Sequence, residues 1–145
     1  MGTVLDDVTD DTIDARHVLR RVDDWEARVE GLYAAVKEWL PEGWTARDGA
    51  TVRMYEELMR KFNVPARPIP TLLLGNGAGG SAMLEPRGLW IIGTNGRVDM
   101  KCGDRHYLIV DVAGNFEAPQ WEAASVERRL DRVALTESWL AQALS

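Results

Sequence analysis

The sequence predicts an α+β fold in which a long N-terminal helix and a C-terminal helical segment pack on an antiparallel β-meander. Three observations support this prediction: a helical apolar stripe in residues 16–40, strand and turn signals over residues 81–113, and helical spacing after Pro119. Helices that are separate in sequence from an antiparallel sheet are typical of the α+β class. The length of 145 residues suits one domain. We therefore expect a single α+β domain over residues 14–145, preceded by an acidic tail or helix start over residues 1–13.

The N-terminal helix is predicted by apolar residues that recur every three or four positions on one helical face. Asp14 is one of several residues that could cap its start, and Pro41 and Gly43 are expected to end it. The stripe is broad enough for its N-terminal half to contact a protein partner or a second copy of the chain, although a wholly intramolecular helix is the alternative. The predicted partner interface comprises Val18, Leu19, Val22 and Trp25.

The next segment is ambiguous between helix and strand. We expect a short strand over residues 44–47, a turn at Asp48-Gly49 and then a helix over residues 52–62, because apolar residues there fit helical spacing better than alternation. Pro68 and Pro70 impose extended backbone, so residues 69–74 are expected to form a strand near a sheet edge. The glycine-rich segment over residues 75–80 has the spacing of a dinucleotide-binding loop. Too few residues follow it for the required helix, and a loop between two strands is expected instead.

A β-hairpin is predicted over residues 89–102, with Asn95-Gly96 as its two-residue turn and positive φ at both turn residues. A further strand over residues 106–112 would complete a three-stranded meander. Side chains alternate across a strand, so Met100 and Cys102 are expected on an apolar face. If the second turn has two or four residues, His106 joins the opposite, charged face, whereas a three-residue turn would reverse this. The predicted binding residues on the charged face are Trp90, Arg97, Asp99, Lys101 and His106.

The C-terminal third returns to helical spacing. Val126, Leu130 and Val133 predict one helical segment, and Thr136 is a suitable cap for a second that carries Leu140 and Leu144.

Composition restricts the function classes. The chain has 23 acidic and 17 basic residues, and residues 1–14 contain five Asp without a basic residue. The remainder is nearly neutral and has no basic stripe, which argues against a nucleic-acid partner. No apolar run approaches the length of a membrane span, and the first residues lack a secretory signal. With Cys102 as its one cysteine, the chain is expected to be cytoplasmic, without a disulfide, a bound metal or a cofactor.

Two functions are consistent with these features. The first is a non-catalytic accessory or regulatory module that binds another protein through the long helix or the charged sheet face. The alternative depends on Asp99-Met100-Lys101, which resembles the D-x-K half of the signature of PD-(D/E)xK metal-dependent nucleases. This resemblance implies a small metal-dependent hydrolase in which carboxylates bind a divalent cation and a lysine assists the attacking water. Its catalytic residues would be Glu85, Asp99 and Lys101.

Overall fold

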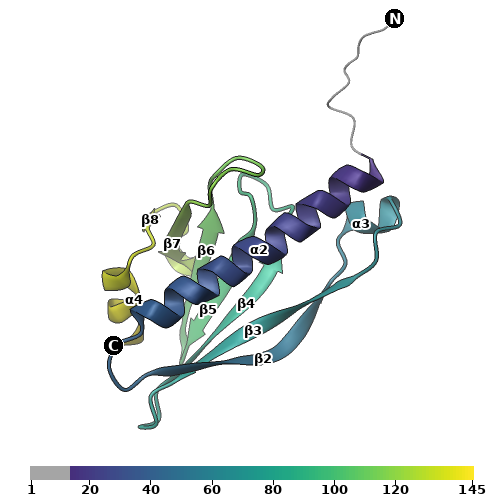
Figure 1. The fold of residues 1–145 in the computed structure, drawn as a ribbon. Coiled ribbons are helices and arrows are strands. Elements are labelled where there is room, and N and C mark those ends of the chain that lie inside the picture. The colour runs from purple at the N-terminus through teal and green to yellow at the C-terminus, as the bar shows by residue number, and fades with distance from the viewer. Residues whose placement is uncertain (1–13) are drawn as a thin grey trace, which may run out of the picture.

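The computed structural model describes residues 14–145, and the expected acidic segment over residues 1–13 lies outside these residues. Seven antiparallel strands form one sheet in sequence order, and helix α2 crosses one face of that sheet (Figure 1). The predicted α+β class is confirmed. The strands are β2 (Thr45–Met54), β3 (Arg67–Gly75), β4 (Ser81–Gly88), β5 (Arg97–Cys102), β6 (Arg105–Asp111), β7 (Trp121–Ser125) and β8 (Val133–Ala134). The helices are α2 (Ala15–Trp39), α3 (Glu57–Lys61), the 3₁₀ turn η1 (Val126–Arg128) and α4 (Glu137–Leu144).

Helix α2 confirms the predicted N-terminal helix and its caps. The Asp14 carboxylate accepts a hydrogen bond from the His17 amide over 2.8 Å, which satisfies one of the free amides of the first turn. The helix ends at Trp39, before Pro41, and Gly43 adopts a φ of 91°. No helix of the described residues is long and apolar enough to cross a bilayer.

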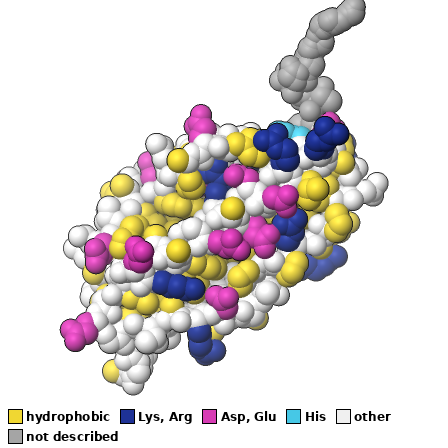
Figure 2. All heavy atoms as spheres, viewed as in Figure 1, with side chains coloured by type: hydrophobic (Ala, Val, Ile, Leu, Met, Phe, Trp, Pro, Cys, Tyr) yellow, Lys and Arg dark blue, Asp and Glu magenta, His cyan; other side chains and the backbone are white. Residues whose placement is uncertain are grey.

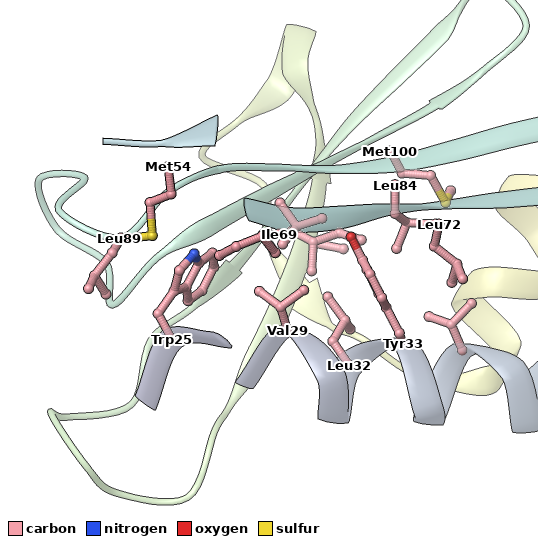
Figure 3. Packing of buried hydrophobic residues seen from close by; sticks show 14 of the residues in the cluster. Trp25, Val29, Leu32, Tyr33, Met54, Ile69, Leu72, Leu84, Leu89 and Met100 are labelled. Carbon is pink, nitrogen blue, oxygen red and sulfur yellow. The ribbon is translucent and has the colours of Figure 1, made fainter. Parts of the chain in front are cut away.

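The apolar stripe of α2 packs on the inner face of the sheet, which we define as the face that α2 covers. Figure 3 shows Trp25, Val29, Leu32 and Tyr33 directed at side chains of the strands. This packing corrects the predicted partner interface. Val18, Val22 and Trp25 are at most 1% exposed within their own chain, so they are not available to a partner, whereas Leu19 is 41% exposed. The wide stripe is covered by strand residues from β2 to β7 and by residues of α4.

Two predictions between the helix and the glycine loop are wrong. No turn is formed at residues 48–49. Strand β2 continues from Thr45 to Met54, and Asp48-Gly49-Ala50 form a bulge opposite β3. A Cβ atom on Gly49 would lie 2.5 Å from Thr71 Oγ1, so the glycine permits a close strand contact there. The helix expected over residues 52–62 is confined to Glu57–Lys61, since its first residues belong to β2. The predicted strand over residues 69–74 is confirmed as part of β3, one position from the sheet edge.

The predicted hairpin over residues 89–102 is also wrong. Strand β5 pairs with β4, which ends at Gly88, and residues 89–96 form a loop. Gly96 has the expected positive φ of 114°, but Asn95 does not. Asn95 is buried and is held by tertiary hydrogen bonds. Its side chain contacts Arg21 and the carbonyl of Gly114, and its backbone amide donates to the backbone carbonyl of Asp111. These long-range contacts override the local preference of the Asn-Gly pair for a hairpin turn.

The C-terminal prediction is half right. Residues 121–134 form β7, η1 and β8 instead of a helix, because Ala123 and Ala124 complete the sheet beside β6. The second segment is confirmed: the Thr136 hydroxyl accepts a hydrogen bond from the Trp139 amide at the start of α4, and Leu140 and Leu144 are buried against the core. The glycine-rich segment joins β3 to β4, as expected.

Candidate functional site

The sheet face opposite α2, which we call the open face, collects most of the predicted binding residues. Strand pairing places Glu85 opposite Asp99, and Lys101 opposite His106. The two-residue turn at Gly103-Asp104 keeps the alternation that this arrangement needs. Met100 and Cys102 are buried on the inner face, so the predicted assignment of β5 side chains to faces is confirmed. The charged residues on the open face, which we call the Asp99 cluster, are Glu85, Arg87, Arg97, Asp99, Lys101 and His106.

Asp99 is the centre of this cluster. Its side chain is 2% exposed, and Arg97 Nε contacts Oδ1 over 2.6 Å while Arg97 Nη2 contacts Oδ2 over 3.2 Å. His106 Nε2 lies 2.7 Å from Oδ2. A buried carboxylate needs such charge-assisted hydrogen bonds to offset its desolvation. Both oxygens of Asp99 are therefore committed to neighbouring side chains.

The contact with Asp99 also determines which nitrogen of the His106 ring carries a hydrogen. An ionised carboxylate only accepts hydrogen bonds, so Nε2 must carry a hydrogen and donate it to Oδ2. The other ring nitrogen, Nδ1, is then an acceptor in the neutral ring and a donor in the charged one. The His106 side chain is 35% exposed, so part of the ring is accessible from the open face.

Three longer ion pairs surround the centre. Glu85 Oε1 lies 3.5 Å from Arg87 Nη1 and 3.8 Å from Lys101 Nζ, and Arg87 Nε lies 4.0 Å from Asp99. The side chains of Arg87 and Lys101 are about half exposed, so these pairs are weak and readily exchanged for a partner. The three lysine and arginine side chains outnumber the two carboxylates, which gives the cluster an excess of positive charge.

A second feature of the open face is a row of side chains that crosses four strands. Pairing aligns Arg47 with Leu73, Leu73 with Met83, and Met83 with Lys101. A shallow cavity of about 530 Å³ is lined by all four of these residues. We call them the cross-strand row; its half-buried apolar centre has a cationic side chain at each end.

The structure places Trp90 away from the open face, which corrects its predicted role there. Its amide and that of Leu89 donate to the Glu56 carboxylate over 3.1 and 2.9 Å, and its ring lies 5.6 Å from the Arg21 guanidinium. The error arose because residues 89–94 were predicted to be a strand. For the same reason Arg87 was not among the predicted binding residues, although the alternation of Met83, Glu85 and Arg87 along residues 81–88 indicates that they share a face.

No group of three or more His, Cys, Asp or Glu within residues 14–145 is arranged to hold a metal ion. Glu85 and Asp99, the carboxylates of the nuclease-like alternative, are nevertheless direct cross-strand partners, and Lys101 lies beside them. Cys102 is buried on the inner face, 3.3 Å from Arg105 Nη2. The chain was compared with protein-family models, curated proteins and solved structures, and none of them matches it.

Proposed function

We propose that the chain is a non-catalytic protein-interaction module that binds an acidic segment of a partner protein on its open sheet face. The observation that carries this proposal is the cross-strand row, in which Leu73 and Met83 lie between the cations Arg47 and Lys101. Arg47 and Lys101 are three strand spacings apart, or about 14 Å at about 4.8 Å per strand. An extended segment whose alternate side chains read acidic, apolar, acidic would span this row.

The charge distribution of the molecule supports the choice of an acidic partner. The whole chain has a formal net charge of −6, and Figure 2 shows acidic side chains along the outer side of α2. On the open face the cations are in excess, and the buried Asp99 is already neutralised by Arg97. Complementary charge of this kind steers association and orients a partner more than it adds affinity. An acidic segment would therefore approach the open face in preference to the helix side.

Fluorescence anisotropy with a labelled peptide that repeats Glu-Ser-Leu-Ser-Glu tests the proposal. We expect saturable binding that weakens as salt is added, and at least a fivefold loss of affinity for Arg47→Glu and for Lys101→Glu. The matched control is Lys37→Glu, the same charge change on the exposed side of α2, which should change affinity less than twofold. A peptide with Lys in place of Glu should not bind.

The acidic residues of the N-terminal segment require a second titration, because they carry the same charge as the probe peptide. The chain with Asp6, Asp7, Asp10 and Asp11 changed to Asn should bind the peptide at least as tightly as the original chain. The proposal would be wrong if Lys37→Glu weakened binding as much as Lys101→Glu did, or if the acidic peptide did not bind either chain.

The metal-dependent hydrolase is a second candidate because Glu85, Asp99 and Lys101 are adjacent on the open face. A cation there would have to replace the hydrogen bonds that Asp99 accepts from Arg97 and His106. Thermal unfolding with Mn²⁺ or Mg²⁺ separates the two functions, since a cation site stabilises the folded chain by mass action. An increase in melting temperature that Glu85→Gln abolishes would favour the hydrolase, and no increase would favour the interaction module.

A further inference from the structure

Residues 6–10 of the chain have the alternation that a segment bound to the cross-strand row would need. Asp6, Val8 and Asp10 are acidic, apolar and acidic at alternate positions, which extended backbone directs to one side. Asp6 and Asp10 are four residues apart, or about 13 Å at about 3.3 Å per residue. This length matches the distance of about 14 Å between the two cationic ends of the row. The chain therefore contains a segment that fits its own row.

Only one of the two alternations in this segment fits. Asp7 and Asp11 have the same spacing as Asp6 and Asp10, but Thr9 lies between them. Thr9 would place a hydroxyl group against the apolar centre of the row, and burial of an unpaired hydroxyl group is unfavourable. The pair Asp7 and Asp11 therefore provides a control with the same charge and the same spacing.

The row is accessible to a segment of another molecule. Arg47 and Lys101 are exposed, and the side chains of Leu73 and Met83 are half-buried between them. The cavity of about 530 Å³ over the row is also lined by small residues, which are Gly75, Ser81 and Gly103. These small residues leave space beside Leu73 and Met83 for an apolar side chain of a bound segment.

Both ends of the row can bind a carboxylate. Among the described residues, Arg47 forms no ion pair. The adjacent Asp48 is paired with Leu72, which belongs to the core on the inner face, so its carboxylate lies on the other side of the sheet. Lys101 lies 3.8 Å from Glu85, and its side chain is 46% exposed. A second carboxylate can therefore approach Lys101 from the solvent.

Two contacts show where the row lies relative to the start of α2. Arg67, the first residue of β3, binds Asp23 of α2. Further along both elements, the Pro70 carbonyl accepts a hydrogen bond from the Tyr33 hydroxyl over 2.7 Å. Strand β3 and α2 therefore run in the same general direction, as Figure 1 shows. The row crosses β3 at Leu73, which is beyond Pro70 and further from the start of α2.

Residues 6–10 cannot reach the row of their own chain. The helix from Asp14 to Tyr33 spans about 28 Å at about 1.5 Å per residue, and the row lies beyond this point on the opposite face of the sheet. Between Asp10 and Asp14, fully extended backbone covers at most about 14 Å. A row that binds Asp6, Val8 and Asp10 must therefore belong to another molecule.

We propose that residues 6–10 of one chain bind across the cross-strand row of a second copy. Asp6 and Asp10 pair with the cations at the two ends of the row, and Val8 packs on Leu73 and Met83. This inference rests on the proposed function, since it takes the row as the site for an acidic segment. Another copy of the chain and an acidic partner protein then compete for the same row.

Sedimentation velocity of the full chain over a hundredfold range of concentration measures this association. We expect the average mass to rise above that of one chain, and to fall again when salt or the peptide Glu-Ser-Leu-Ser-Glu is added. Asp6→Asn with Asp10→Asn should weaken association at least tenfold. The matched control, Asp7→Asn with Asp11→Asn, removes the same charge and should leave association within threefold.

Mixing two variants tests whether the contact joins two molecules. Lys101→Glu changes the row and keeps the segment, whereas Asp6→Asn with Asp10→Asn changes the segment and keeps the row. Each variant alone should be monomeric. An equimolar mixture should form a complex of two chains at the highest concentration used, because one intact segment is then available to one intact row.

The possible results distinguish this inference from the function on which it rests. If the full chain stays monomeric while the peptide binds its open face, the inference is overturned and the proposed function stands. Equal losses for the two pairs of Asp variants would also overturn it, since net charge would then explain the association. If the peptide does not bind the chain with Asp6→Asn and Asp10→Asn, the proposed function and this inference are both wrong.

Discussion

Individual residues in this chain have roles that depend on contacts far away in sequence. Gly96 combines two requirements: its φ is 114°, and the Trp25 ring occupies the space that a side chain would need. Gly93 in the same loop has a φ of 82°, and a Cβ atom added to it would meet no other atom within 4 Å. Substitutions at Gly93 and Gly96 can therefore be compared to distinguish the cost of a left-handed backbone from the cost of a steric clash.

We expect Gly93→Ala to lower the free energy of unfolding by about 1–2 kcal/mol, which is the cost of the left-handed conformation. Gly96→Ala should cost about 1–3 kcal/mol more, because the added methyl group displaces the Trp25 ring. Urea denaturation of both variants measures the difference. Equal losses for the two variants would show that the Trp25 ring moves aside freely.

The positions of some side chains could be predicted from the sequence, and those of others could not. The opposite faces of Asp99 and Met100 follow from strand alternation alone, so they were predictable. The location of Trp90 was not, since it depends on Glu56 and Arg21, which are more than thirty positions away. The local turn preference of Asn95-Gly96 was a true signal for Gly96 and a false one for Asn95, whose side chain is used in tertiary contacts.

Helix and sheet are connected by polar contacts as well as by the apolar core. Arg28 of α2 is buried and binds Asp111 of β6 over 2.5 Å, and it also donates to the carbonyl of Glu117 in the following loop. Arg67 of β3 binds Asp23 and Glu26 of α2 at a more exposed position. Helix periodicity predicted α2 correctly, but no sequence pattern indicates that an arginine in its buried side pairs with a strand carboxylate.

Removing the buried Arg28 should cost far more than removing Arg67, whose side chain is 24% exposed. We expect Arg28→Leu to lower the free energy of unfolding by about 3–5 kcal/mol, because Asp111 is left buried without its partner. Arg67→Leu should cost no more than about 1 kcal/mol, as is usual for exposed ion pairs. Chemical denaturation of both variants at the same salt concentration tests this, and equal costs would contradict the role assigned to burial.

Tyr33 connects α2 to β3 and should make stability sensitive to alkaline pH. Burial raises the pKa of Tyr33 above its ordinary value of 10.0, so the folded chain keeps the phenolic proton at a pH where the unfolded chain loses it. The stabilisation is complete below about pH 10 and is lost as pH rises from there toward the folded pKa, by about 1.4 kcal/mol per pH unit.

Tyr33→Phe isolates this effect. At pH 8 the variant should be less stable than the original chain by about 1 kcal/mol, because the Pro70 carbonyl loses its hydrogen bond. Between pH 10 and 11 that difference should shrink or reverse, since phenylalanine does not ionise. Urea denaturation at pH 8, 10 and 11 gives the comparison, and a difference that stays constant with pH would contradict a buried, protonated Tyr33.

Over the whole molecule, the core draws on both ends of the described chain. One cluster of buried side chains contains Val18 of α2, strand residues from β2 to β7, and Leu140, Ala143 and Leu144 of α4. Tyr107 of β6 packs edge-on against Trp139 of α4, with ring centroids 5.2 Å apart. The overall class was predictable because apolar residues recur with a different spacing in helices and in strands. The order and number of strands were not, because they depend on tertiary pairing.

This shared core predicts that residues 14–145 unfold as one cooperative unit, as a single domain would. Leu140→Ala, near the C-terminus, should lower the free energy of unfolding by about 2–5 kcal/mol through the cavity it leaves, while Leu130→Ala, at a position that is 91% exposed, should change it by less than about 0.5 kcal/mol. Circular dichroism in the far and near ultraviolet should give coincident transitions for both variants. If Leu140→Ala instead produced an early transition confined to the near-ultraviolet signal, α4 would be a separately unfolding segment, and the sheet and α2 would form the core without it.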